Sequence, residues 1–156
     1  MTLFELKFLE PAKDYASPFP HDSEGFTDTW WIPNIDMPYY DYDDLGETKL
    51  IQFLVDHVEV GRAKITDWCL STAYIGINSE INTKQIWFFE IHQNARRKGY
   101  GTEFAKQLIN IYPDVPLIAF SENADDFWSR IGWIYYPRKD GDKHCGKLFI
   151  SKTVSS

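Results

Sequence analysis

Residues 84–92 (KQIWFFEIH) are the most apolar strand-like stretch of the chain, and they lead into a glycine-containing loop and then a helical pattern. The loop reads ARRKGYGT over residues 95–102. After it, Phe104, Leu108 and Ile111 recur at the spacing of one helix face. This strand, loop and helix constrain the possible folds more than any other segment, because they place a central strand next to an amphipathic helix.

Further strands are predicted before and after this unit. Residues 48–55 and 58–65 are expected to form a hairpin around Asp56 and His57. A short second helix is predicted to begin with Asn123 as its cap and to stop at Gly132. The remaining predicted strands span residues 2–9, 71–77, 115–120, 133–137 and 146–153. No repeat or linker divides the chain, so we expect one α/β domain (α+β in the finer sense) over residues 1–156.

The amino-acid composition limits the kinds of partner that the protein is expected to bind. The 156 residues include 16 basic and 23 acidic side chains, a net charge of −7, which argues against a nucleic-acid partner. The two cysteines show no spacing typical of a metal site, so we expect no metal. The amino end lacks the pattern of a secretion signal, and the apolar runs are shorter than the ~20 residues that span a bilayer. We therefore expect a cytoplasmic protein without a membrane partner, either a monomer or a homodimer paired through an edge strand such as 146–153.

The loop after the central strand has the features of an anion site. Arg96, Arg97 and Lys98 are followed by Gly99 and Gly101, at the start of a helix. A helix amino end carries unpaired backbone N–H groups and partial positive charge, and glycine lets a phosphate approach the backbone. This stretch is therefore predicted to hold the phosphates of a nucleotide-bearing cofactor.

Two common phosphate motifs do not fit the loop. The pattern GxxxxGK[ST] is absent, and the dinucleotide pattern GxGxxG would need glycine at position 104, where Phe104 stands. These mismatches argue against the usual ATPase and dehydrogenase interpretations.

The remaining pattern, R-x-x-G-x-G after a strand and before a helix, resembles motif A of the Gcn5-related N-acetyltransferases (GNAT superfamily). The similarity extends over FFEIHQNARRKGYGTEFAKQL (88–108) and over SENADDFWSRIGW (121–133), which resembles the family's motif B. Residues 53–65 are similar to the family's second and third strands. Together the resemblance covers residues 48–136.

The resemblance implies a bent, mostly antiparallel mixed sheet flanked by helices, with splayed central strands and acetyl-CoA (coenzyme A) as the cofactor. The pantetheine arm would lie along the central strand, and the pyrophosphate on the backbone N–H groups of residues 97–102. The implied cofactor-binding residues are Phe89, Ile91, Arg96, Arg97, Lys98, Gly99, Tyr100, Gly101, Thr102, Asn123 and Trp128.

The catalytic groups that the resemblance implies are altered here. Gln85 stands where a family glutamate often acts as the base, and an amide cannot take a proton. Glu90 and His92 on the same strand are alternative candidates. Trp128 stands where a family tyrosine often acts as the acid, and an indole donates a hydrogen bond without releasing a proton. A hydroxyl of Tyr100, Tyr135 or Tyr136, or water, would replace it.

The acceptor side is predicted from residues 21–47, which hold eight carboxylates and no lysine or arginine, interleaved with aromatic residues. Carboxylates and aromatic faces suit a cationic amine. The alternative is a solvated acidic loop whose aromatic residues fill the core. The candidate substrate-binding residues are Trp30, Trp31, Tyr39, Tyr40 and Asp41.

These patterns predict an N-acetyltransferase that moves an acetyl group from acetyl-CoA to an amine of a cationic acceptor. A small molecule such as a polyamine or an aminoglycoside-like compound is slightly favoured over a peptide or protein. The alternative is an acyl-CoA-binding or partner-binding module with the same fold and weak or no catalysis. A different phosphate-ligand protein is a third, weaker interpretation.

Overall fold

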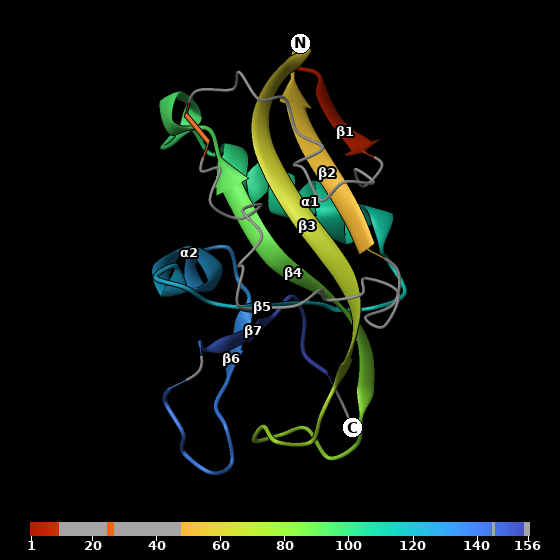
Figure 1. Cartoon of the computed structure of the whole chain (residues 1–156), viewed down its shortest axis with the longest axis vertical. Helices are drawn as coiled ribbons and strands as arrows, with labels where there is room; N and C mark the ends of the chain where they lie inside the picture. The colour runs from red at the N-terminus through yellow and green to blue at the C-terminus, as the bar shows by residue number, and fades with distance from the viewer. Residues whose placement is uncertain (10–24, 27–47, 145, 155–156) are drawn as a thin grey trace, which may run out of the picture.

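The computed structural model describes residues 1–9, 25–26, 48–144 and 146–154 (Figure 1). Its seven strands form one sheet in the order β1-β2-β3-β4-β5-β7-β6. No helix in the described part of the chain is long and apolar enough to cross a membrane. The strands are β1 (Phe4–Leu9), β2 (Thr48–Val55), β3 (Val58–Leu70), β4 (Ile81–Ile91), β5 (Leu117–Phe120), β6 (Ile134–Tyr136) and β7 (Leu148–Ile150), and the α-helices are α1 (Tyr100–Ile111) and α2 (Asp125–Arg130).

The sheet is mixed and mostly antiparallel, as predicted. All neighbouring strands run antiparallel except β4 and β5, which are parallel. Their parallel pairing is short: Lys84–Ile86 pair with Leu117–Ala119. Beyond Ile86, β4 continues without β5, so the two central strands separate there.

A β-bulge lies where this separation begins. In the pairing of β3 with β4, Lys64 faces Phe88 and Ile65 faces Ile86, so Trp87 is the extra residue. A bulge bends its strand and increases the local twist. The bulge at Trp87 directly follows the last β4–β5 pair, and it gives a physical reason for the splay that the sequence resemblance implied.

The predicted hairpin is confirmed. Asp56 and His57 both have positive φ angles, 49° and 69°, as in the type I′ turns that match strand twist. Asp56 also accepts a hydrogen bond through Oδ1 from the backbone N–H of Leu3, at 2.8 Å. Two residues without a strong turn signature therefore make a tight turn, supported by contact with the segment before β1.

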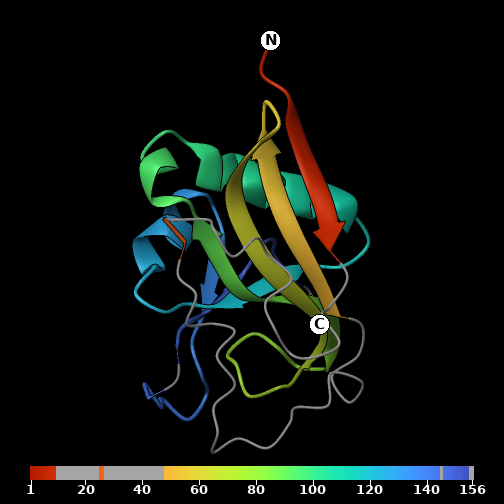
Figure 2. The same cartoon turned by 45° about the horizontal axis from the view of Figure 1, so that its top comes forward.

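Helix α1 lies across one face of strands β1–β4 (Figures 1 and 2). Its Phe104 ring stacks between Phe53 and Phe89, with ring centroids 4.9 Å and 4.8 Å away. Gly61 on β3 permits this approach, because a Cβ there would lie 2.8 Å from the Phe104 ring. The sheet and the helix thus enclose the main apolar core.

Two predicted strand assignments need correction. Residues 71–77 form no strand beyond an isolated bridge between Tyr74 and Arg138, and β3 instead extends to Leu70. The segment 146–153 was expected at an edge, but β7 lies between β5 and β6, so its backbone is paired on both sides. In both cases the outcome depends on pairing between strands that are distant in sequence, which local sequence patterns do not encode.

The start of α2 also differs from expectation. Asn123 adopts a positive φ of 57°, and the helix begins two residues later at Asp125. The N-cap is Ala124, which has no side-chain cap hydrogen bond, and its own N–H donates to Ser121 Oγ at 3.2 Å. The predicted stop at Gly132 is confirmed by its φ of 92°.

Candidate active site

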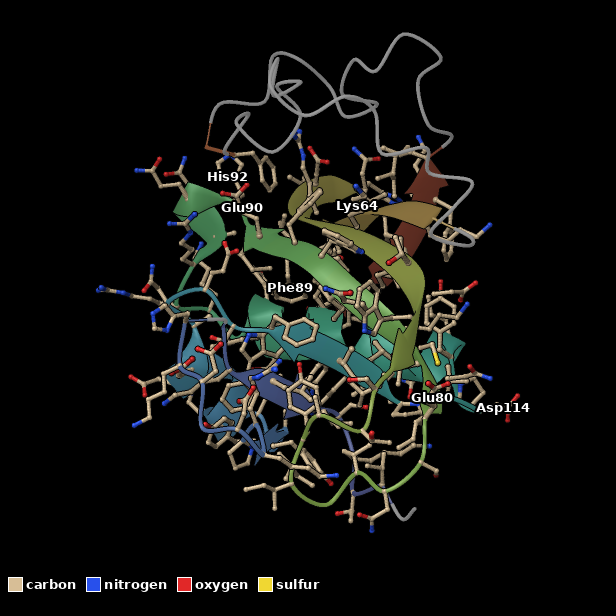
Figure 3. All side chains as sticks on the ribbon, turned by 60° about the horizontal axis from the view of Figure 1, so that its bottom comes forward. Lys64, Glu80, Phe89, Glu90, His92 and Asp114 are labelled. Atoms are coloured by element: carbon tan, nitrogen blue, oxygen red, sulfur yellow. The ribbon has the colours of Figure 1, made fainter. Side chains whose placement is uncertain are left out.

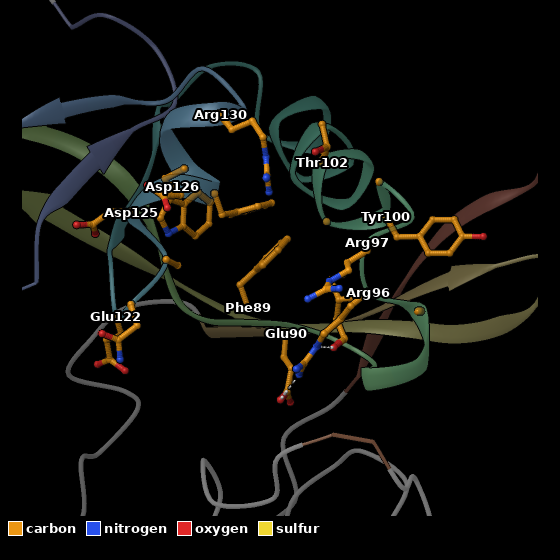
Figure 4. A pocket seen from close by; sticks show the side chains of 18 residues that line it. Phe89, Glu90, Arg96, Arg97, Tyr100, Thr102, Glu122, Asp125, Asp126 and Arg130 are labelled. Carbon is orange, nitrogen blue, oxygen red and sulfur yellow. Dashed lines mark hydrogen bonds and ion pairs between the residues drawn. The ribbon is translucent and has the colours of Figure 1, made fainter.

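A cavity of about 940 Å³ opens where β4 and β5 separate (Figure 4). Its walls are the end of β4, the loop before α1, the first turn of α1, and the segment from the end of β5 through α2. It is lined by Phe89, Glu90, Ile91, Ala95, Arg96, Arg97, Gly99, Tyr100, Gly101, Thr102, Glu122, Asn123, Ala124, Asp125, Asp126, Phe127, Trp128 and Arg130.

Most of the predicted cofactor-binding residues meet in this cavity. Ten of the eleven line it, and Lys98 does not. Among the predicted catalytic residues, Glu90 lines the cavity and Gln85 does not. The candidate acceptor residues Trp30, Trp31, Tyr39, Tyr40 and Asp41 lie outside the described residues.

The loop before α1 contains two residues with positive φ angles, and both line the cavity. Arg97 has φ 66° and Gly99 has φ 79°. Arg96, which follows the 3₁₀ turn (Gln93–Ala95) and precedes Arg97, has an extended backbone. The helix that follows adds the unpaired N–H groups of its first turn.

The two glycines of the loop serve different purposes. A Cβ on Gly99 would meet no atom within 4 Å, so glycine is favoured there by its left-handed conformation. A Cβ on Gly101 would lie 3.0 Å from Cε2 of Phe127. Gly101 therefore lets the Phe127 ring pack against the start of α1, a packing reason that the motif alone did not reveal.

The side chain of Arg96 binds groups at the end of β4. Its Nε donates to the carbonyl oxygen of Ile91 at 3.0 Å, and its guanidinium lies 3.6 Å from Oε2 of Glu90. Figure 4 draws both interactions at the lower rim of the cavity. Arg96 thus positions Glu90 as well as contributing positive charge to the site.

An aromatic cluster forms the cavity floor. The Phe89 ring lies 5.6 Å, centroid to centroid, from both Phe127 and Trp128, and Trp128 packs 4.5 Å from Trp133. Trp128 is buried. The floor therefore offers apolar surface to a ligand arm, and Trp128 supplies no acidic proton.

Gln85 sits beside the point where the strands part. It pairs with Thr66 on β3 and with Ile118 on β5, one position before the last β4–β5 pair. The side chain is buried, and its Oε1 has no hydrogen-bond donor among the described residues. A buried acceptor without a donor is costly, so this oxygen is suited to a donor from a bound water.

Glu90 and His92 lie together at the end of β4 (Figure 3). The Nδ1 of His92 accepts the N–H of Asn94 at 3.0 Å, which leaves Nε2 to carry the proton of the neutral ring. The Phe26 ring meets the imidazole edge-on at 5.1 Å, and the backbone carbonyl of Gly25 accepts the N–H of Gln93 at 3.0 Å. Residues 25–26 therefore dock against this end of the strand.

The candidate tyrosine hydroxyls do not converge on the cavity. Tyr100 lines it, but Figure 4 shows its hydroxyl pointing away. The hydroxyl of Tyr136 accepts the N–H of Val154 at 3.3 Å, and Tyr135 is exposed on β6 beside Lys147. None of these three tyrosines is placed as a proton donor at the cavity.

Sequence reasoning missed the contribution of α2 to the charge of the cavity. Asp125 and Asp126 in its first turn and Arg130 at its end all line the wall, as does Glu122 before it. Ser121 and Lys147 lower the pKa of Asp125 by hydrogen bonding to its carboxylate. Helical spacing held a usable signal, since Arg130 follows Phe127 by three residues and so shares its face.

No family model and no curated protein matches this chain. Among solved structures, the Bacillus subtilis N-acetyltransferase YlbP in complex with coenzyme A is 12% identical, with a TM-score of 0.53 over 67% of each chain. AtaT complexed with acetyl-methionyl-tRNAfMet is 11% identical, with a TM-score of 0.63 over 94% of this chain and 93% of that chain. The chain therefore has the fold of the GNAT acetyltransferases, as its motifs predicted.

The expectation that nucleic acid is excluded was wrong. A KacTA–DNA complex contains a chain of the same fold, with 12% identity and a TM-score of 0.60 over 95% of this chain and 92% of that chain. The AtaT structure contains a tRNA. The error lay in using net charge, because contacts with phosphates depend on local positive charge and on bound partners rather than on the sum over a chain.

Proposed function

We propose that this protein is an acetyl-CoA-dependent N-acyltransferase. The observation that carries the proposal is the cavity at the fork of β4 and β5, bordered by the left-handed Arg97 and Gly99 and the first turn of α1. An anion-binding helix start beside an apolar floor suits a ligand with phosphates at one end and an uncharged arm at the other. The shared fold with YlbP, solved with coenzyme A, supports the same ligand class.

The ligand would run from the loop toward the fork. Its diphosphate would rest on the N–H groups of residues 97–102, and its arm would lie along β4 at Phe89 and Ile91. Within the described residues, the β5-facing edge of β4 has no strand partner beyond Ile86. Amide groups of the arm can therefore pair with this edge as an added strand would.

In the reaction, the nitrogen of a neutral amine attacks the thioester carbonyl carbon. A C–N bond forms, the C–S bond breaks, and the sulfur leaves as a thiolate while the nitrogen loses a proton. We assign the proton to Glu90, directly or through water, because its carboxylate lies at the cavity and is held by Arg96. Gln85 is buried and does not line the cavity, so it is given no role in this step.

No acid is assigned to the thiolate. Trp128 cannot release a proton, so water protonates the sulfur after it leaves. A thiolate is a tolerable leaving group near pH 8, and alignment of the two reactants accounts for much of the acceleration in this mechanism.

The acceptor is an amine, with a cationic small molecule slightly favoured. This preference rests on the acidic and aromatic composition of residues 21–47. Peptides and aminoacyl-tRNA also present amines, and AtaT was solved with acetyl-methionyl-tRNAfMet. An acceptor panel must therefore contain a polyamine, an aminoglycoside, a lysine peptide and an aminoacyl-tRNA.

Calorimetric titration of acetyl-CoA into the wild type and into Thr102→Glu tests the cofactor site. Thr102 lines the cavity in the first turn of α1, where a carboxylate favours the helix but repels phosphate. We expect at least about a fivefold loss of affinity, from repulsion of about 1–4 kcal/mol at ~4 Å. Gly101→Glu is a poorer choice, because its Cβ would press on Phe127.

Asn110→Asp is the matched control, since it adds the same charge to the exposed far end of α1. It should bind acetyl-CoA within about twofold of the wild type. A folded wild type that binds no acetyl-CoA would overturn the proposal. Equal affinity of the wild type and Thr102→Glu for acetyl-CoA would show that the phosphates bind elsewhere.

The second candidate function is a binding module with weak or no turnover. The amide of Gln85 and the buried indole of Trp128, at the two places expected to exchange protons, favour it. Release of free CoA thiol with the acceptor panel separates the candidates. Cofactor binding with no release above hydrolysis for any acceptor would favour the module.

A further inference from the structure

The cavity wall formed by α2 has opposite charges at its two ends. Asp125 and Asp126 occupy the first turn, and Arg130 is the last residue. All three line the cavity. A charged ligand would therefore have a preferred direction along this wall, with its anionic end at Arg130.

Arg130 faces the start of α1. It follows Phe127 by three residues, so the two side chains share one face of α2. The Phe127 ring in turn packs against Gly101 in the first turn of α1. Figure 4 shows the Arg130 side chain extending into the gap between α2 and α1. Its guanidinium thus approaches the predicted phosphate site from the side opposite to the loop.

The guanidinium of Arg130 is also not neutralised by the protein. Within the described part of the chain, no carboxylate lies at ion-pair distance from Arg130 or from Arg97, whereas Arg96 and Arg138 contact Glu90 and Asp140. Arg130 is exposed, and the chain has a net charge of −7. Two unpaired guanidinium groups that line one cavity from two elements suit a ligand with several phosphates.

We propose that Arg130 binds the 3′-phosphate of the coenzyme A thioester, an inference that rests on the proposed function. The loop N–H groups and Arg97 serve the diphosphate, which is bonded to the 5′ carbon of the same ribose. The 3′-phosphate is a separate dianionic group a few bonds away, and Arg130 on α2 offers it a cation that the diphosphate does not occupy. Arg130 therefore makes the site selective for coenzyme A over its 3′-dephospho form.

The test is calorimetric titration of acetyl-CoA and of 3′-dephospho-acetyl-CoA into the wild type, Arg130→Gln and Arg130→Lys. We expect the wild type to prefer acetyl-CoA by about tenfold, as for a lost charge-assisted hydrogen bond. Arg130→Gln should lose this preference by binding acetyl-CoA about tenfold more weakly while binding the dephospho form within twofold of the wild type. Arg130→Lys should retain most of the preference.

Lys7→Gln is the charge-matched control, because Lys7 is exposed on β1 at the far edge of the sheet. It should keep the wild-type preference. Thermal unfolding of each variant checks that Arg130, which also favours the helix end by its charge, is not needed for folding.

Equal weakening of both ligands in Arg130→Gln would overturn the inference and leave the proposed function intact, since Arg130 would then contact the diphosphate or act structurally. Unchanged binding of both ligands would also overturn it. A wild type that binds neither ligand would overturn the inference together with the proposed function.

Discussion

The fold partly buries the charged side chain of Lys64, and this burial costs folding free energy. On β3 it lies between Leu50 and Phe88, which are both buried. Burial lowers the pKa of Lys64 from 10.5 to about 8. Its ammonium lies 5.4 Å from the centroid of the exposed Trp87 ring at the bulge, which offsets part of the cost by a cation–π contact. Figure 3 places Lys64 on β3, away from Phe89 in the cavity.

This lowered pKa predicts a pH dependence of stability. Between pH 8 and 10.5 the folded protein has released the proton of Lys64, whereas the unfolded chain still holds it, so stability rises with pH over that window. Below pH 8 both states are protonated and the full cost remains. We therefore expect the wild type to gain stability relative to Lys64→Met between pH 8 and 10.5.

Denaturant unfolding of both proteins at pH 7, 8, 9 and 10 measures this difference. Other groups that titrate in the same range are common to both proteins and cancel. A difference that stays constant from pH 7 to 10 would show that burial does not perturb Lys64.

At the scale of elements, the position of α1 depends on one glycine and one ring. Phe104 fills the space between Phe53 and Phe89, and a Cβ on Gly61 would lie 2.8 Å from Phe104 and 3.2 Å from Ile91. The start of α1 forms one wall of the cavity. The distance from α1 to the sheet therefore affects both stability and the site.

Gly61→Ala is expected to destabilise the protein by about 1–3 kcal/mol, the usual cost of overpacking a filled core. Chemical denaturation measures the change. In a Phe104→Leu background the smaller side chain leaves room, so the same alanine should cost clearly less. An equal cost in both backgrounds would contradict the proposed contact.

At the scale of the whole molecule, the sheet consists of two parts joined at β4 and β5. Strands β1–β4 form the larger part, and β5, β7 and β6 form the smaller. Three register pairs join them, together with the aromatic contacts of Phe89 with Phe127 and Trp128. A ligand in the cavity would touch both parts at once.

Acetyl-CoA is therefore expected to slow amide hydrogen exchange severalfold or more in residues 97–103 and 122–130, on the two sides of the fork. Strand β1, at the far edge, should change little. Hydrogen-exchange mass spectrometry with and without the ligand provides the measurement. Protection confined to one side would place the ligand outside the fork.

Much of the element order was predictable because it follows from local chemistry. The apolar run of β4, the glycines before α1 and the stop at Gly132 each act within a few residues, and all three appear as expected. The cofactor residues followed from motif spacing, and ten of them do line one cavity. The start of α2 was misplaced because Asn123 is a favourable N-cap residue in sequence, whereas in the structure it has a positive φ and the helix begins at Asp125.

The sequence alone determined the central strand and the helix that follows it, the position of the glycine loop, and the loss of proton-exchanging groups at Gln85 and Trp128. Only the tertiary structure decided that β7 lies inside the sheet, that the bulge at Trp87 begins the splay, and that Arg130 shares a cavity with Arg97. The physical reason is the sequence separation between the residues that interact. Backbone conformation and helix periodicity are set by neighbours in sequence, whereas strand pairing and converging charge depend on contacts between distant residues.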